Sequence, residues 1–538
     1  MENEVSNLLQ EDNKQENTNT KSIKNYFFSF IKSNYILLIS FVIQAIGLLL
    51  LTYYVTGTEF FKFSKFIQAV ILLDIAFLFK NKFSKIVCLI CLLIIDFQLT
   101  NYLAAGDFIK TEALLNLKEV SSIGASTTIK LSIFLVFVII LFLPNIIISP
   151  IKKAKFPVII ILLLLVICSK PIYEFSKALN NVYEIMTFKP NIEYAEEFKH
   201  KTNIIGNSPV LGKDMNVILI FAEGFSDCVI SSEYTPNLYN LCKKSLIVTN
   251  YYNHTYPTFR GIRGANISGY QLHELEWVTS MENYYKDFNA ISLPMILNKN
   301  GYKTIFVSPH NKFGQFTKLL NVVGYNEIDA PENTDGQDDK TTFEHLFAQI
   351  DYCKKNNQKF IVSTYLLGTH LGLDSPHQKY GDGKNVFLNK FYNQDYYFGK
   401  FLENLEAKNY LNDTILIFTA DHAAYPAPDF KKSFNSKATE MVDKIPLIIY
   451  KKDIIAQEYD AKNRNSLSLT PTIINILDIN NQENYFLGNS IFCDETSEWQ
   501  YISTTGHRIF TTKNGKVEVI KPNQNLKEKL KKFFKSFG

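Results

Sequence analysis

Four apolar runs beyond residue 214 are each followed, within a few residues, by acidic or histidine side chains. The runs and these side chains are 217–222 with Glu223, 303–308 with His310, 359–366 with His370, and 415–419 with Asp421 and His422. Runs rich in Ile, Val and Leu that alternate with helical segments indicate a parallel sheet, buried on both faces, in an α/β domain. Ligands gather beyond the carboxyl ends of such strands, so we expect these side chains to lie near one site.

The acidic and imidazole groups favour a metal site. Asp421 and His422 are adjacent, and past the end of a strand both can turn toward one ion, with Glu223 as a further carboxylate. Carboxylate and imidazole ligands suit Zn²⁺ or Mn²⁺, with Mg²⁺ as a further candidate. The alternative is a helix N-cap aspartate beside a surface histidine. His310 and His370 are candidates for contacting a phosphate or protonating a leaving group, and a structural role is the alternative for each.

Residues 254–263 place a hydroxyl, Thr258, between a proline and two arginines in a glycine-containing turn. A free threonine hydroxyl is barely ionised at pH 7, but a bound divalent ion lowers the pKa of its oxygen ligands. Thr258 is therefore the candidate nucleophile, with Thr255 as its rival and a plain turn threonine as the alternative. Arg260 and Arg263 could hold phosphate oxygens in fork geometry, or form surface ion pairs.

The first third of the chain has a different character. Of the 538 residues 46% are hydrophobic and 20% charged, but most of the long apolar runs lie between residues 33 and 169. Because five such runs follow in succession, we predict five membrane-spanning helices rather than buried core helices. Their approximate bounds are 33–58, 66–79, 86–104, 131–149 and 156–169. Lysines gather before the first run and in two alternate loops, which predicts a cytoplasmic N-terminus and an extracytoplasmic location for everything after residue 170.

These features divide the chain into five predicted segments. They are a cytoplasmic tail (1–32), a five-helix membrane domain (33–170), a connector helix region (171–213), a catalytic α/β domain (214–520) and a basic amphipathic tail (521–538). The last segment could return to anionic lipid or pack on the domain. The net charge of +4 is too small to indicate nucleic-acid binding. Four cysteines could form up to two disulfides or remain thiols, namely Cys228, Cys242, Cys353 and Cys493.

The motifs of the α/β domain resemble the lipoteichoic acid synthase and periplasmic-glucan phosphoglycerol transferase branch of the alkaline phosphatase and sulfatase superfamily. The matching segments, in the expected order, are 216–226, 235–238, 256–261, 368–370, 393–399, 418–422, 444–447, 470–472 and 487–490. The five-span N-terminal region is also similar to that branch. The resemblance implies a three-layer α/β/α domain outside the membrane and one divalent ion held by Glu223, Thr258, Asp421 and His422. It also implies Thr258 as the nucleophile and His370 on the substrate headgroup.

Three comparisons within the superfamily refine this interpretation. Residues 309–316 lack the arginine with which related synthases bind the headgroup phosphate. The loop around Thr258 has no Cys or Ser in the pattern that sulfatases need to make formylglycine, which argues against a sulfatase. The resemblance to phosphoethanolamine transferases is looser, because residues 222–224 read Ala-Glu-Gly rather than Gly-Glu-Thr or Gly-Glu-Ser.

From the residues and the resemblance together we expect a multi-pass, metal-dependent transferase of the bacterial cytoplasmic membrane, with its catalytic domain outside. Thr258 would take the headgroup of a phospholipid donor and pass it to an envelope glycan, lipid or polymer, with Arg260, His310 and His370 contacting the substrate. Phosphoglycerol is the first choice of headgroup, and neither nucleotide nor nucleic acid is required. The alternatives are a phosphoethanolamine transferase, a phosphodiester or sulfate-ester hydrolase, and a non-catalytic envelope sensor.

Overall fold

The computed structural model describes residues 170–187, 191–199, 206–271, 290–334, 336–480, 482–505 and 508–537, together with isolated residues between 25 and 114. The five predicted membrane spans therefore lie outside the described residues, apart from such isolated positions. Within the described part of the chain, no helix combines the length and the apolar character that crossing a bilayer requires. The chain divides into two compact units, Met1–Thr187 and Phe188–Gly538.

The first unit contains helix α8 (Lys170–Met186), which occupies the start of the predicted connector. The helical spacing of its apolar residues predicts this element, and the structure confirms it. Tyr173, Leu179 and Tyr183 on this helix are exposed. The rest of the connector, from Phe188 onward, belongs to the second unit.

The second unit is built on an eight-stranded sheet with the order β4-β3-β5-β1-β6-β7-β2-β8. The strands are β1 (Asn216–Ala222), β2 (Leu246–Thr249), β3 (Lys303–Val307), β4 (Glu327–Asp329), β5 (Phe360–Leu366), β6 (Thr414–Ala420), β7 (Leu447–Tyr450) and β8 (Gln457–Asp460). All of them pair in parallel except β7, which runs antiparallel to both β6 and β2. The prediction of a mostly parallel sheet is confirmed. The exception is β7, where the apolar residues at 446–450 also predict a strand. β7 runs opposite to β6 because the chain between them turns back at the end where β6 finishes, instead of crossing to the other end of the sheet.

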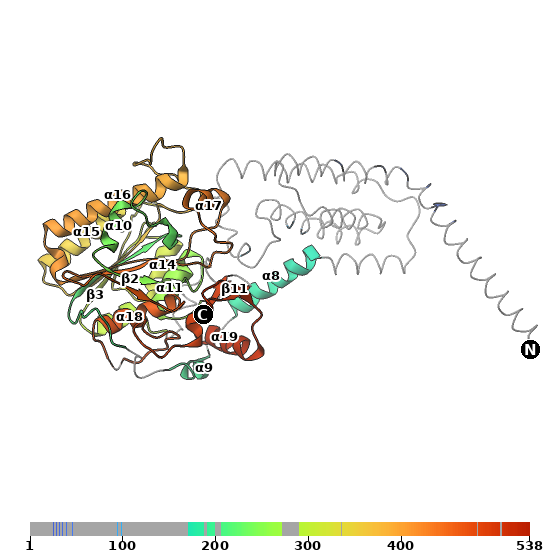
Figure 1. Ribbon diagram of the computed structural model, residues 1–538. Coiled ribbons are helices and arrows are strands. Elements are labelled where there is room, and N and C mark those ends of the chain that lie inside the picture. The colour runs from blue at the N-terminus through green and yellow to red at the C-terminus, as the bar shows by residue number, and fades with distance from the viewer. Residues whose placement is uncertain are drawn as a thin grey trace, which may run out of the picture. The chain divides into compact units, whose positions relative to one another are not determined.

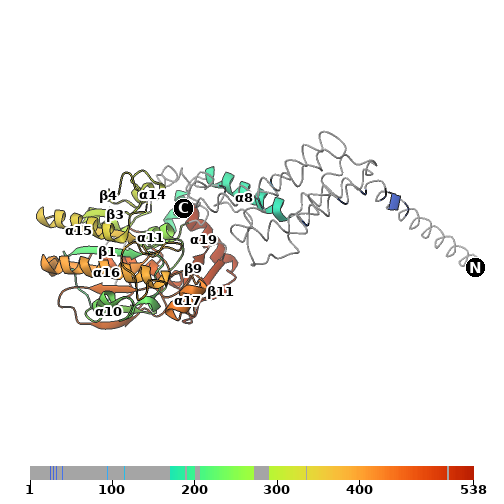
Figure 2. The same ribbon diagram turned by 90° about the horizontal axis from the view of Figure 1, so that it is seen from above.

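Helices cover both faces of this sheet. They are α10 (Pro236–Cys242), α11 (Thr258–Ile267), α13 (Leu293–Lys299), α14 (Gln315–Val323), α15 (Asp339–Lys355), α16 (Val386–Ala407), α17 (Pro428–Phe434) and α18 (Leu469–Ile476). One group, α10, α15 and α16, packs together on one side, and α11, α13, α14 and α18 pack together on the other (Figures 1 and 2). Every residue of β1, β5 and β6 is buried, as strands covered on both faces require.

The segment predicted as a glycine-containing turn is instead the start of helix α11. Its glycines serve close packing. A Cβ atom at Gly261 would lie 2.1 Å from the carbonyl oxygen of Asp421, and one at Gly264 would lie 2.0 Å from His254 Nε2. Gly261 therefore allows the helix to approach the end of β6, and Gly264 allows it to pack on His254. The first of these contacts brings Thr258, the first residue of α11, to the carboxyl end of β6.

The C-terminal part adds a small antiparallel sheet and a final helix. The sheet has the order β11-β10-β9 and consists of β9 (Ile502–Thr505), β10 (Arg508–Thr511) and β11 (Glu518–Ile520). Helix α19 (Gln524–Phe537) packs on α9 (Ile192–Glu196), as Figure 1 shows. Leu530, Phe533 and Phe537 on its apolar face are buried in the domain. Of the two alternatives for the basic tail, the structure therefore shows the packed helix.

The four cysteines of the second unit are unbridged. Cys242, Cys353 and Cys493 are buried, and Cys228 is exposed. The alternative of thiols, rather than of disulfides, is the one that the structure shows.

Replacing Phe533 by alanine tests the packing of α19. Its ring is 1% exposed and makes an edge contact with Phe198 at 5.2 Å between centroids. We expect the variant to lose about 3–5 kcal/mol of unfolding free energy, the usual cost of removing a buried phenylalanine ring. Denaturant unfolding of the full-length protein measures this loss, with Phe534→Ala, a half-buried neighbour, as the milder control. If Phe533→Ala unfolds at the same denaturant concentration as the wild type, this would contradict the packing of α19 on the domain.

Candidate active site and metal centre

Two neighbouring strands deliver the acidic residues to one place. β1 and β6 pair in parallel with Ala222 opposite Ala420, so that Glu223 and Asp421 leave the sheet at the same edge. The backbone N–H of Gly224 donates to Asp421 Oδ1 at 2.9 Å, which ties the two strand ends together. Both carboxylates are buried, at 5% and 1% exposure. The prediction that these side chains meet beyond the strand ends is confirmed in the structure.

Glu223, Asp421 and His422 together form a buried set of metal-ligand atoms. One donor atom of each lies within 4.8 Å of the others. His422 Nε2 is 3.5 Å from Glu223 Oε1 and 3.5 Å from Asp421 Oδ2. The other ring nitrogen of His422 lies 2.8 Å from the carbonyl oxygen of Ala423, which orients Nε2 toward the carboxylates.

The donor set fits a divalent cation. Asp421 Oδ2 is buried and lacks a hydrogen-bond partner. Leaving a buried carboxylate oxygen unsatisfied is costly, and a cation among these atoms would satisfy it. Two carboxylates and one imidazole match the preferences of Zn²⁺ and Mn²⁺.

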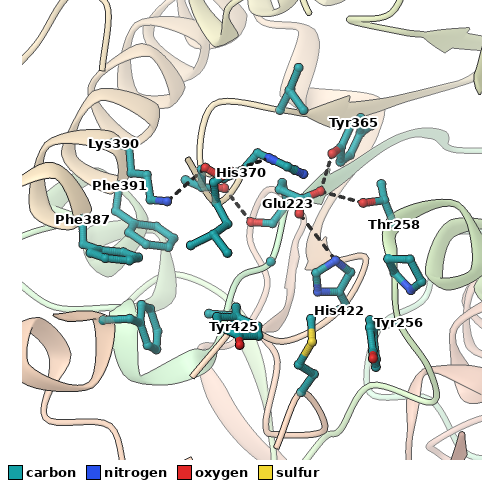
Figure 3. Close-up of a pocket in the computed structure, with 18 of the residues that line it drawn as sticks. Glu223, Tyr256, Thr258, Tyr365, His370, Phe387, Lys390, Phe391, His422 and Tyr425 are labelled. Carbon is teal, nitrogen blue, oxygen red and sulfur yellow. Dashed lines mark hydrogen bonds and ion pairs between the residues drawn. The ribbon is translucent and has the colours of Figure 1, made fainter. Parts of the chain in front are cut away.

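Thr258 adjoins this set from the first turn of α11. Its hydroxyl donates to Glu223 Oε2 at 2.8 Å, and the hydroxyl of Tyr365 donates to the same oxygen (Figure 3). Thr258 is 7% exposed and borders the pocket described below. The rival nucleophile, Thr255, is not among the described lining residues, and its hydroxyl donates to the Thr504 carbonyl at 2.8 Å.

The charges of the cluster are strongly coupled. Burial, the largest single cause, would raise the pKa of Glu223. The charge and hydrogen bond of His422, together with His370 and the hydrogen bond from Tyr365, outweigh burial and hold the pKa below its ordinary value. Burial and the neighbouring charge of Glu223 raise the pKa of Asp421. Burial would lower the pKa of His422, but the two carboxylates raise it to about 10. A proton on His422 competes with a cation for Nε2, so metal affinity is expected to rise with pH.

A pocket of about 310 Å³ opens over the cluster. His370 and His310 both line it, as predicted from their positions after β5 and β3. His370 is exposed, with Nδ1 2.8 Å from the Leu371 carbonyl oxygen. The ring of His310 stacks on Tyr365 at 6.0 Å between centroids.

The two arginines of α11 lie elsewhere. Arg260 is 1% exposed, is absent from the described lining of the pocket, and has its guanidinium 5.9 Å from the ring centre of Tyr256. Arg263 is also buried and donates through Nη2 to the Phe537 carbonyl at 2.6 Å. Neither arginine is among the described residues that line the pocket, and the contact of either with substrate stays a prediction. Because the segment is a helix and not a turn, successive side chains point to different sides of it.

Comparison with known proteins places this fold. The family model described as Sulfatase matches residues 215–479. The domain belongs to the alkaline phosphatase and sulfatase superfamily. A crystal structure of an alkaline phosphatase superfamily protein from Vibrio parahaemolyticus matches with a TM-score of 0.50 and 15% identity. The match covers 65% of this chain and 96% of that one, and at this identity it concerns the fold of the superfamily domain alone.

Two further solved structures are similar to the superfamily domain at lower scores. The lipoteichoic acid synthase LtaP from Listeria monocytogenes has 16% identity and a TM-score of 0.49, covering 66% of this chain and 96% of its own. The C-terminal periplasmic domain of EcEptC from Escherichia coli has 14% identity and a TM-score of 0.38, covering 54% of this chain and 90% of its own.

Sequence reasoning missed two residues of the site. Tyr365, inside strand β5, has the apolar neighbours of an ordinary core residue, and nothing in the pattern marks its hydroxyl as a partner of Glu223. Lys390 lines the pocket from α16, whereas the sequence pattern predicts this helix only over 395–406. Extending the helical pattern back to Phe387 and Phe391 would have placed Lys390 on a helix between two aromatic residues.

Removing the hydroxyl of Tyr365 tests whether it positions Glu223. We expect Tyr365→Phe to weaken metal binding by about 10- to 100-fold, the usual effect of losing a hydrogen bond to a metal ligand. Titration with Mn²⁺ or Zn²⁺, followed by thermal melting, measures the change. Tyr325→Phe is the matched control, because Tyr325 is buried but bonds to Ser363 and Asn266. Equal metal affinity in both variants would show that Tyr365 has no such role.

Proposed function

We propose that this protein transfers the headgroup of a phospholipid, with phosphoglycerol as first choice, to a glycan, lipid or polymer of the cell envelope. The transfer passes through a covalent phospho-Thr258. One observation carries the proposal, namely the 2.8 Å contact between Thr258 Oγ1 and Glu223 Oε2 beside Asp421 and His422. A hydroxyl at a helix N-terminus, next to a fitting cation site and facing a pocket, is suited to attack a phosphate.

The first half-reaction forms the covalent intermediate. Thr258 Oγ bonds to phosphorus as the bond between phosphorus and the diacylglycerol oxygen breaks. The Thr258 proton leaves along the existing hydrogen bond to Glu223 Oε2. The departing oxygen takes a proton at the open side of the pocket, where His370 lies. When bound, a divalent ion would lower the pKa of the attacking hydroxyl and draw charge from the phosphate oxygens.

The second half-reaction regenerates the site. An acceptor hydroxyl gives up its proton at the open side of the pocket, where His370 lies, and its oxygen bonds to phosphorus. The bond from phosphorus to Thr258 Oγ breaks, and Thr258 Oγ recovers the proton that Glu223 Oε2 had taken. The energy of the lipid phosphodiester is kept in the intermediate, so the reaction needs no nucleotide. The lysine distribution around the predicted spans supports an extracytoplasmic location, where such donors and acceptors meet.

The pocket walls support an amphiphilic donor. Phe387, Phe391 and Phe430 form an apolar side, whereas His370 and Lys390 offer polar groups. A pocket lined mainly by apolar groups with a few placed polar ones is typical of sites for small organic ligands. A lipid headgroup joined to a glycerol backbone presents both kinds of surface.

Intact-mass analysis tests the proposal. The full-length protein in detergent is incubated with Mn²⁺ or Zn²⁺ and with short-chain phosphatidylglycerol or phosphatidylethanolamine, and the released diacylglycerol is measured. We expect a glycerol phosphate adduct together with diacylglycerol in equal amount. An ethanolamine phosphate adduct would assign the alternative donor, and free headgroup phosphate with every acceptor tested would assign a hydrolase. Metal-bound protein that forms neither adduct nor product would overturn the proposal.

A further inference from the structure

A buried lysine forms part of the pocket wall. Lys390 lies in the first two turns of α16 and is 2% exposed. Its ammonium donates to the backbone carbonyl of His370 at 3.1 Å and lies 4.5 Å from the ring centre of Phe387. Among the described residues that line the pocket, Lys390 is the only lysine or arginine. In Figure 3 it extends toward His370, on the side of Glu223 away from Thr258.

The carboxylates around Lys390 are engaged elsewhere. Glu223 accepts hydrogen bonds from Thr258 and Tyr365, and Asp374 pairs with Lys379. Within the described part of the chain, no carboxylate lies within ion-pair distance of the Lys390 ammonium. Burial lowers the pKa of Lys390 to about 8, and the charges of Glu223 and Asp374 only partly offset this. A buried ammonium held by one carbonyl and one ring is costly to maintain, which points to an anionic partner in the pocket.

Because the pocket is small, the positive charge of Lys390 acts on a bound ligand at any position in it. A space of about 310 Å³ is roughly 8 Å across, and like charges at that distance in a partly buried site weaken binding by on the order of tenfold. An ammonium on the ligand would therefore be repelled by Lys390 in any orientation. A phosphate whose substituent is uncharged would be attracted without that penalty.

We propose that Lys390 selects the donor headgroup by its charge, favouring phosphate linked to an uncharged polyol such as glycerol and disfavouring phosphate linked to an ammonium-bearing group such as ethanolamine. This inference rests on the proposed function, because it concerns the donor of the same site. The segment that follows β3 does not share this role, because its lysine, Lys312, pairs with Glu332 and is absent from the described lining of the pocket.

Binding measurements test this selection separately from transfer. Glycerol 3-phosphate and O-phosphoethanolamine are titrated calorimetrically into the full-length protein in detergent with Mn²⁺ present. We expect the wild type to prefer glycerol 3-phosphate by roughly tenfold or more, and Lys390→Met to bind it about tenfold more weakly with the preference reduced toward unity. Lys390→Arg should keep the preference.

The control is Lys400→Met, which makes the same change on the same helix at an exposed lysine paired with Glu403. It should leave both affinities unchanged. If Lys390 only tethered the His370 carbonyl, Lys390→Met would weaken both ligands equally, and an unchanged ratio would overturn the inference. A different measurement would show that the proposed function is wrong. In that case no adduct forms on Thr258 with either lipid, whatever the ratio of the affinities for glycerol 3-phosphate and O-phosphoethanolamine.

Discussion

Replacing Thr258 by alanine is expected to abolish the covalent adduct and to reduce headgroup transfer by on the order of 10⁴- to 10⁶-fold, the scale reached when a catalytic nucleophile is removed. Thr258 Oγ1 is the hydroxyl that contacts Glu223 Oε2 beside the ligand set, and its methyl group has no part in the chemistry. The loss should therefore fall on the rate of transfer and not on stability, because the side chain is small and lies at the border of the pocket. Intact mass and diacylglycerol release, measured on wild type and variant side by side, give the result.

Two further variants make this result specific. Thr258→Ser keeps a hydroxyl in place and should retain a measurable adduct. Thr255→Ala removes the rival hydroxyl, which donates to the Thr504 carbonyl away from the pocket lining, and should transfer at close to the wild-type rate. An adduct that persists in Thr258→Ala but disappears in Thr255→Ala would assign the nucleophile to Thr255 instead.

Most of the site can be predicted because the sequence shows where the buried strands end. A buried parallel strand is an apolar run of fixed direction, so the residue that follows it must lie at a known edge of the sheet. This reasoning brings Glu223, Asp421 and His422 together before any coordinates are known, and places His310 and His370 nearby. It also gives the mostly parallel sheet, whereas helix α8 is predicted separately from the helical spacing of its apolar residues.

The remaining features depend on packing, which a single sequence does not display. The glycines at 261 and 264 indicate a turn by composition. In the structure they lie in a helix, and glycine is needed at both positions because the neighbouring residues leave no room for a Cβ atom. Arg260 and Arg263 on that helix are buried and absent from the described lining of the pocket, although their spacing from Thr258 suggests phosphate contacts. The hydroxyl of Tyr365 and the ammonium of Lys390 gain their roles only from partners far along the chain.

Asp421→Asn is expected to remove metal binding while leaving the fold intact. At a metal concentration about 100 times the dissociation constant, a bound ion stabilises the wild type by about 2.7 kcal/mol. The variant should lose this stabilisation, because an amide is a poorer ligand than the carboxylate whose Oδ2 it replaces. Its Oδ1 can still accept from the Gly224 N–H, so the link between β1 and β6 remains.

The variant should also behave differently once metal is removed. In EDTA, Asp421→Asn is expected to be at least as stable as the wild type, because it replaces a carboxyl group that is costly to ionise, its pKa being raised by burial and by the neighbouring charge of Glu223. Thermal melting with EDTA or with Mn²⁺ or Zn²⁺, alongside metal analysis of the purified proteins, separates the two effects. Asp339→Asn is the matched control, since Asp339 is a buried carboxylate that accepts from the Gly368 N–H and should keep the metal-induced shift. If neither ion changes the melting temperature of the wild type, the metal centre has no place in the mechanism. If the metal-induced rise in melting temperature is lost in Asp421→Asn but kept in Asp339→Asn, the ion binds at the residues that adjoin Thr258.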